Sequence, residues 1–212
     1  MQGQTYEIGV IAGGTNFIGD VGSTNYISPN AVMAGGMFRY NRNPRVTYRF
    51  TAKFGSLQAD DLKSDDASRQ VRGYEFSTDM LELGAGIEYS FWEFNLHESF
   101  NKPATPYLHT GIEFFNHDLF RPSANGLIKT DNEWDFAIPL TLGFKMAIGS
   151  RFIAGAEIGA RYTFIDHMDG SVQEANPENP PYFGNISNDD WYMFTGVTLT
   201  YTFGRRPCYC GF

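Results

Sequence analysis

The chain has little cysteine, and its two cysteines, Cys208 and Cys210, both lie within the last five of the 212 residues. Cysteines so close to one end cannot hold a core together with disulfides. Long apolar runs are also missing, because no stretch approaches the roughly 18 residues of a membrane-spanning helix. This excludes a transmembrane helix. It does not exclude a membrane, because the alternating strands of a β-barrel average out in hydropathy.

Basic residues are scarce as well, and the formal net charge is −8. Binding to phosphates needs basic patches, so this charge argues against a nucleic-acid partner. The acids gather at 60–66, at 166–190 and around Asp131 and Glu133, where we expect loops. Met1 is followed at once by polar residues, which predicts no signal peptide, so the leader of an exported form would have been removed or replaced.

Motifs that carry enzyme chemistry are not present: there is no HExxH, no phosphate-binding Walker loop and no GxSxG. The histidines are scattered over different segments, which disfavours a shared zinc site; they are His97, His109, His117 and His167. The acids of DDLKSDD, and Asp166 with Asp169, lack the regular spacing of a calcium loop, so solvated acidic loops are favoured over a calcium site. We expect no catalytic activity, no cofactor and no metal.

What the chain does have is alternation with a period of two residues. The chain is organised around the stretch at 191–203, WYMFTGVTLTYTF, where one face is largely apolar with aromatic residues at both ends. The other face turns to small and hydroxylic residues after its first two aromatics. A β-strand of this length can cross a bilayer, for which roughly 9–11 tilted residues suffice.

The same alternation predicts eight strands, at about 6–12, 31–40, 46–54, 81–91, 106–115, 134–148, 152–164 and 191–203. Tyr74 and Phe76 are out of phase with Leu81, which predicts a bulge or a loop-borne extension there. Connections are long after the first, third, fifth and seventh strands, very short after the second and sixth, and intermediate after the fourth. This layout predicts an all-β fold, an eight-stranded antiparallel transmembrane β-barrel with long extracellular loops, short turns and both termini in the periplasm.

The barrel should span residues 1–204, and a periplasmic tail should follow at 205–212. A soluble barrel that buries its apolar face is the alternative. Aromatic residues at the strand ends favour the membrane, and so do the balanced charges of the polar face, which suit a closed, mutually paired interior filled by side chains. Its acids are Glu7, Glu82, Glu88, Glu113 and Glu157, and its bases are Arg39, Arg49, Lys53, Lys145 and Arg161.

Two segments on the side of the short turns are candidates for partner contacts. The connection FWEFNLHESFNKP carries Trp92 and Phe94, which fit an interfacial girdle or docking equally well, and then Leu96 and Phe100, which lie further from the strand and are better docking candidates. The tail carries a basic pair and both cysteines: Arg205, Arg206, Cys208 and Cys210. An unpaired thiol in an exported protein suggests an intermolecular disulfide; a strained internal bridge, or a lipid or metal at the CYC motif, is the alternative.

Several stretches, in one order along nearly the whole chain, resemble a known family. They include EIGVIAGGTNFIGDVG, RYNRNPR, AGIEYSFWEF, the Gly/Glu/Arg pattern of 152–164, DWY at 190–192 and the cysteine-bearing tail. Together they are similar to the PorG-like small outer-membrane barrels of the type IX secretion system of Bacteroidota. The resemblance implies a barrel tied to a periplasmic ring of a lipoprotein and its partner, with Cys208 slightly favoured over Cys210 for a covalent bond to the lipoprotein.

Two function classes follow from these expectations. One is a structural anchor that fixes a periplasmic assembly to the outer membrane. The other is a self-contained barrel that acts as an adhesin or surface-binding protein through its acidic outer loops. The tail favours the anchor, because an adhesin needs no charged, cysteine-bearing segment after its last strand.

Overall fold

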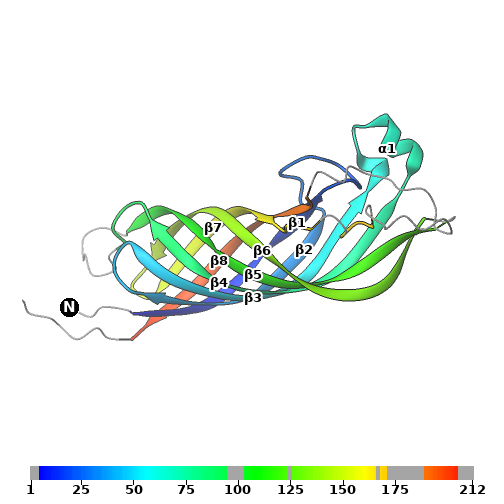
Figure 1. Ribbon diagram of the computed structural model, residues 1–212. Coiled ribbons are helices and arrows are strands. Elements are labelled where there is room, and N and C mark those ends of the chain that lie inside the picture. Colours follow the sequence, from blue (N-terminus) through cyan, green and yellow to red (C-terminus); the bar gives the residue numbers. More distant parts are fainter. Residues whose placement is uncertain (1–4, 95–102, 124–125, 166–167, 171–188, 205–212) are drawn as a thin grey trace, which may run out of the picture.

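The computed structural model describes residues 5–94, 103–123, 126–165, 168–170 and 189–204. Eight antiparallel strands form a closed barrel in which each strand pairs with its sequence neighbours and β8 pairs with β1 (Figure 1). The strands are β1 Tyr6–Ile18, β2 Ala31–Asn41, β3 Val46–Asp60, β4 Glu75–Ser90, β5 Ala104–Ser123, β6 Gly126–Ile148, β7 Phe152–Tyr162 and β8 Trp191–Phe203. A 3-10 helix, η1 (Asp61–Lys63), and a short helix, α1 (Ala67–Arg72), lie between β3 and β4.

The predicted fold class is confirmed, but several strands are longer than predicted. The chain between β5 and β6 was expected to be a long loop, and instead both strands continue as a hairpin that reaches Ser123 and Gly126. Likewise β1 continues to Ile18 and β3 to Asp60. These extensions are rich in polar residues and so lose the apolar alternation of the wall. β7 instead ends early, at Tyr162, because Phe164 takes a left-handed φ of 60°.

The predicted bulge near Phe76 is wrong. β4 pairs with β3 without interruption from Val46↔Tyr89 to Asp60↔Glu75. Phe76 is buried on the inward face that Glu82 also occupies. The apolar residues change from even to odd positions along β4 because its inward positions are apolar near its first residues, at the loop end, and charged further along. The one register shift in this region lies between Leu119 and Phe120 of β5.

The barrel has two different ends. The turn end carries the connections β2–β3, β4–β5 and β6–β7, together with the start of β1 and the end of β8, since Tyr6 pairs with Phe203. The loop end carries the other four connections and α1, which lies at the far end of the barrel from the N-terminus in Figure 1.

The two faces of the wall differ as a membrane barrel requires. Inward positions are polar and buried, whereas outward positions carry apolar side chains that remain exposed, such as Val10 (59%), Phe54 (63%) and Val197 (61%). So large an apolar surface is expected against lipid and not against water. The soluble alternative, which buries the apolar face, is therefore wrong.

Aromatic rings meet near both ends of the wall. At the turn end Tyr6 stacks on Tyr40, which stacks in turn on Tyr48. At the loop end the ring of Trp191 meets those of Tyr26 and Tyr162. Amphipathic rings at these levels are typical of the two lipid–water interfaces. Among the described residues, no helix has the length and apolar character needed to cross a membrane.

One glycine of the inward face is required by packing. Gly143 of β6 lies opposite Tyr107 of β5, and a Cβ at residue 143 would stand 2.3 Å from Cζ of that ring. The buried Tyr107 ring therefore lies against bare backbone. Any larger residue at 143 would push the ring into the charged groups of the lumen.

We expect Gly143→Ala to destabilise the barrel by about 1–3 kcal/mol, the usual effect of overpacking a filled core. Urea unfolding of the detergent-solubilised barrel measures this. Gly36→Ala is the matched control, because a Cβ there meets only the Gly9 carbonyl oxygen, at 4.0 Å. If the overlap with the ring is the cause, Gly143→Ala adds little to Tyr107→Ala. Equal destabilisation by Gly36→Ala would contradict the assignment.

Candidate functional site

The ten charged residues predicted for the interior all point into the lumen. Each is buried, and the most exposed of them, Glu157, reaches only 4%. The structure arranges them in three layers along the barrel axis. Unpaired charge is very costly in such a place, so the pairing within each layer determines what the lumen can do.

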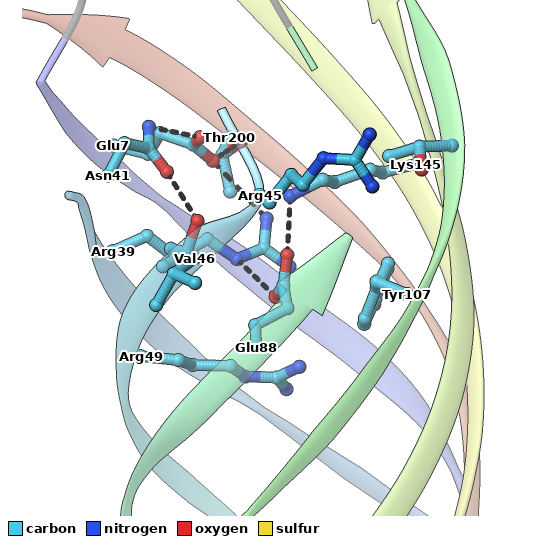
Figure 2. A network of polar contacts seen from close by, with 12 residues as sticks. Glu7, Arg39, Asn41, Arg45, Val46, Arg49, Glu88, Tyr107, Lys145 and Thr200 are labelled. Atoms are coloured by element: carbon cyan, nitrogen blue, oxygen red, sulfur yellow. Dashed lines mark hydrogen bonds and ion pairs between the residues drawn. The ribbon is translucent and has the colours of Figure 1, made fainter. Parts of the chain in front are cut away.

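The layer nearest the turn end is centred on Arg39 and Glu88 (Figure 2). Arg39 contacts Glu7 at 3.3 Å and Glu88 at 3.1 Å, and Lys145 lies 2.5 Å from the other oxygen of Glu88. Glu7 also accepts hydrogen bonds from the Asn41 amide and the Thr200 hydroxyl. This layer links β1, β2, β4, β6 and β8.

The middle layer is a bidentate pair. The guanidinium of Arg49 donates to both oxygens of Glu157, at 2.7 and 2.8 Å. The Tyr107 hydroxyl donates to the same carboxylate at 2.6 Å. Bidentate pairs of this kind are the strongest and most directional ion pairs in proteins. They join β3 and β5 to β7 across the lumen.

The third layer, nearer the loop end, shares two carboxylates between two bases. Lys53 contacts Glu82 and lies 3.5 Å from Glu113, and Arg161 donates to Glu113 at 3.0 Å. The Tyr192 hydroxyl donates to Glu82 at 2.7 Å. The ring of Phe194 lies 5.0 Å from the Lys53 ammonium and 5.3 Å from the Arg161 guanidinium, which places both cations over an aromatic face.

Above the third layer the lumen becomes apolar. A buried cluster fills it at the loop end, and its larger members are Phe17, Met33, Leu57, Phe76, Met80, Phe115, Phe120 and Phe194. Val21 and Met168, from the β1–β2 and β7–β8 connections, are fully buried within the same cluster. The lumen therefore continues from three ionic layers into an apolar plug.

Buried carboxylates hold the segment at residues 19–22 across this plug. Asp169 accepts hydrogen bonds from the amides of Asp20 and Val21, at 3.0 and 3.1 Å. Asp61 accepts from the Gly22 amide at 2.8 Å and forms an ion pair with Arg72 at 2.7 Å. The expectation that these acids are merely solvated loop residues is wrong for Asp61 and Asp169, which are both fully buried.

Other acids of the same loops remain at the surface. Asp66 is the N-cap of α1, where hydrogen bonds from the hydroxyl and amide of Ser68 hold the pKa of its carboxyl below the ordinary value. No group of three or more potential metal ligands occurs among the described residues. His109 and His117 are both buried and inward facing, and His117 lies 2.9 Å from Asp135. His97 and His167 lie outside the described residues.

At the turn end, Phe94 from the described part of the β4–β5 connection lies over the lumen. The ring of Phe94 lies 4.9 Å from the Lys145 ammonium, and the Phe94 amide donates to the Pro44 carbonyl at 3.0 Å. Phe94 therefore covers the lumen and is not part of the interfacial girdle. Trp92 is 59% exposed and precedes Glu93, which forms an ion pair with Arg45 at 3.5 Å.

The other predicted contact residues lie outside the described part of the chain: Leu96, Phe100, Arg205, Arg206, Cys208 and Cys210. The sequence pattern assigned no role to Tyr107 or Tyr192, and it placed Asp61 and Asp169 in solvated acidic loops. Tyr107 and Tyr192 occupy inward positions of predicted strands. The alternation could therefore have indicated that their hydroxyls lie among the charged side chains of the lumen. Nothing in the sequence distinguishes Asp61 and Asp169 from their exposed neighbours.

Comparison with solved structures finds the same architecture in other barrels. Neisserial surface protein A (NspA) superposes with a TM-score of 0.52 at 10% identity, over 93% of this chain and 97% of that one. Ail, the attachment invasion locus protein of Yersinia pestis, superposes with a TM-score of 0.49 at 11% sequence identity. The superposition covers 96% of this chain and 100% of Ail. The N-terminal barrel domain of Pseudomonas aeruginosa OprF superposes with a TM-score of 0.45 at 14% sequence identity. The superposition covers 95% of this chain and 100% of the OprF domain. The likeness to NspA shows the fold, that of an outer-membrane eight-stranded barrel.

The sequence comparisons are more limited. All 212 residues match one family, which is described as "Domain of unknown function (DUF6089)". No curated protein sequence matches the chain.

We expect removal of one partner of the middle layer to destabilise the barrel by about 3–5 kcal/mol, because a buried charge is left without compensation. Arg49→Met and Glu157→Met test this singly, and the double variant should cost clearly less than the sum of the two. Urea unfolding is again the measurement. Lys63→Met is the control, since the Lys63 side chain is 72% exposed and its pair with Asp60 should contribute at most about 1 kcal/mol. Additive single effects would contradict direct coupling.

We also expect the barrel to carry no stable ion current, because side chains fill its lumen and Phe94 closes the turn end. Reconstitution into planar bilayers measures this directly. Reproducible conductance steps that disappear in Arg49→Ala or Glu157→Ala would show instead that ions pass through the charged lumen.

Proposed function

This chain belongs to the DUF6089 family, and we propose that it is a non-enzymatic outer-membrane barrel that anchors a periplasmic ring, made of a lipoprotein and its partner, in the type IX secretion system. In this proposal the turn end and both termini face the periplasm, and the loop end faces outward. The observation that carries the proposal is the filled lumen. A barrel whose interior is packed with paired charges provides no transport path, so its ends and its wall are the surfaces left for function.

The turn end has the composition of a docking surface for an acidic partner. Arg42, Arg45 and Arg151 are exposed there, with Glu93 as the opposing acid. The sequence adds Arg205 and Arg206 immediately after β8. Basic groups at a rim steer an acidic partner and mainly raise its rate of association.

The β2–β3 turn and the β4–β5 connection support each other at this end. The Arg45 guanidinium donates to the Phe91 carbonyl at 3.0 Å, and the Trp92 amide donates to the Thr105 hydroxyl at 3.0 Å. Together with the Phe94–Pro44 hydrogen bond, these contacts fix the chain up to residue 94 against the barrel. The proposed docking residues Leu96 and Phe100 follow directly from this fixed point.

The tail supplies the proposed covalent link. A disulfide from Cys208 or Cys210 to the ring lipoprotein would hold a weak surface contact closed through high effective concentration. The short spacing of the two cysteines disfavours a relaxed bridge between them. In an oxidising compartment an exposed thiol pairs with another thiol.

We expect the native protein, extracted without reductant, to migrate on gels as an adduct with a partner and to return to its own mass with reductant. Cys208→Ser with Cys210→Ser should abolish the adduct, and Cys210→Ser alone should retain it. The controls are the unchanged urea unfolding of each variant and its presence in the outer membrane. The same non-reducing band in the double variant would refute the covalent anchor.

A surface-binding protein that acts through the loop end is the second candidate. It is favoured by Asp61 and Asp169, whose hydrogen bonds hold residues 20–22 of the β1–β2 connection in place at the loop end. This candidate predicts no adduct and a binding activity that does not depend on the tail.

A further inference from the structure

The outer wall of the barrel carries a groove of about 830 Å³ on the side formed by β5, β6, β7, β8 and β1. One outward residue from each of these strands lines it, and the five lie in a single row because each pairs with the next: Pro106, Phe144, Ala156, Val197 and Ala12. The row covers four interstrand spacings, about 19 Å along the wall. We call this cavity the wall groove.

The floor of the wall groove is low because small residues meet there. Ala12 and Ala156 are exposed outward positions whose side chains are too short to fill the space between their larger neighbours. Gly143 and Gly196 also line the groove. Both of these glycines face inward, since a Cβ at either position would meet an aromatic ring of the lumen. Bare backbone therefore reaches the floor.

Larger apolar side chains bound the wall groove. Leu142 lies on the β6 side, and Ile27 of the β1–β2 connection closes the loop end. The segment around Ile27 is held against the outer wall by Asn16, an outward residue of β1 that this segment leaves only 3% exposed. The Asn16 side chain donates to the Asn25 carbonyl at 3.0 Å and accepts from the Ser28 amide at 3.4 Å. The groove is thus formed by the folded chain itself.

At its turn end the wall groove approaches an exposed cation. The Phe91 amide donates to the Pro106 carbonyl at 3.0 Å, and the Phe91 carbonyl accepts from the Arg45 guanidinium at 3.0 Å. Arg45 also lies beside Tyr89 of the outer wall. Its ion pair with Glu93 leaves the Arg45 side chain 45% exposed. A guanidinium in this place can pair with a lipid phosphate at the membrane surface.

We propose that the wall groove retains one phospholipid from the leaflet at the turn end, with an acyl chain along the row from Pro106 to Ala12 and the phosphate beside Arg45. The groove is continuous with the face that meets lipid, so hydrocarbon is what it contacts in the membrane. A chain in the groove touches the floor and both edges, whereas a chain on a smooth wall touches protein on one side only. The summed dispersion contacts therefore hold this one chain more firmly than its neighbours.

The proposal goes beyond the anchor at the turn end and does not depend on it, because the test uses the barrel alone. The full-length protein is refolded into detergent micelles that contain equal amounts of palmitoyl-oleoyl phosphatidylglycerol and phosphatidylethanolamine. The detergent is in large excess, so it displaces lipid from the smooth parts of the wall. Native mass spectrometry then counts the phospholipids that stay bound. We expect one per barrel, with phosphatidylglycerol favoured because it is anionic.

Ala156→Trp and Ala12→Phe fill the wall groove, and each should lower the retained fraction about 10-fold by removing the contacts of the chain with the floor. Ala85→Trp is the matched control, because it adds the same ring to an exposed outward residue of β4 that does not line the groove. Arg45→Ala should lower the retention of phosphatidylglycerol about 3- to 10-fold and remove its advantage over phosphatidylethanolamine. All four variants should unfold at the same urea concentration as the parent.

A second measurement distinguishes a lipid from a protein in the groove. A photoreactive diazirine is attached to Ala156→Cys in a chain that also carries Cys208→Ser and Cys210→Ser, and it is activated in the native membrane. We expect crosslinks to phospholipid, and a crosslink to a polypeptide would overturn the proposal. So would the absence of any retained phospholipid, retention that Ala156→Trp and Ala12→Phe leave unchanged, or an equal loss in Ala85→Trp. Failure of the tail adduct would leave these results unaffected.

Discussion

Mutual pairing of buried charge inside a narrow barrel is the constraint on which the rest of this structure depends. Eight strands leave a lumen that only side chains can fill, and here ten of those side chains are charged. Each must meet a partner inside the barrel. Lys53 meets Glu82 on the neighbouring strand, whereas Arg49 reaches across the lumen to Glu157 and so joins two strands that are not neighbours. Among the described residues, these paired charges and the apolar plug at the loop end fill the lumen.

The same constraint explains what the sequence could predict. One face of each strand meets lipid and the other meets the charged lumen, so apolar and polar residues alternate along the strand. The ten charges could therefore be assigned to the lumen from their odd or even position in each strand. Their partners could not be assigned, since Arg49 and Glu157 are 108 residues apart and the choice depends on strand tilt and register. The sequence predicts a bulge near Phe76 for a related reason. The strand is in fact continuous, but its inward positions change from charged residues in the ionic layers to apolar residues in the plug.

The ends of the barrel were harder to predict because the same residue type serves opposite purposes there. Asp66 caps a helix at the surface, whereas Asp61, five residues earlier, is fully buried and holds both Gly22 and Arg72. Composition predicts solvated loops for both. Only the tertiary contact between distant segments, residues 19–22 and 168–170, shows which carboxylates have a structural role. Phe94 shows the same effect at the turn end, where it lies over Lys145, while the sequence left the girdle and docking equally open for it.

The division of charge between the ends follows from the neutral lumen. Because the ten interior charges cancel, the excess of acid lies outside it, and it gathers at the loop end in residues such as Asp60, Asp65 and Glu75. The exposed arginines Arg42, Arg45 and Arg151 lie at the turn end. The two ends therefore differ in the sign of their exposed charge, with arginines at the turn end and carboxylates at the loop end. The closed barrel keeps these two surfaces apart, because every strand of its wall is paired on both sides.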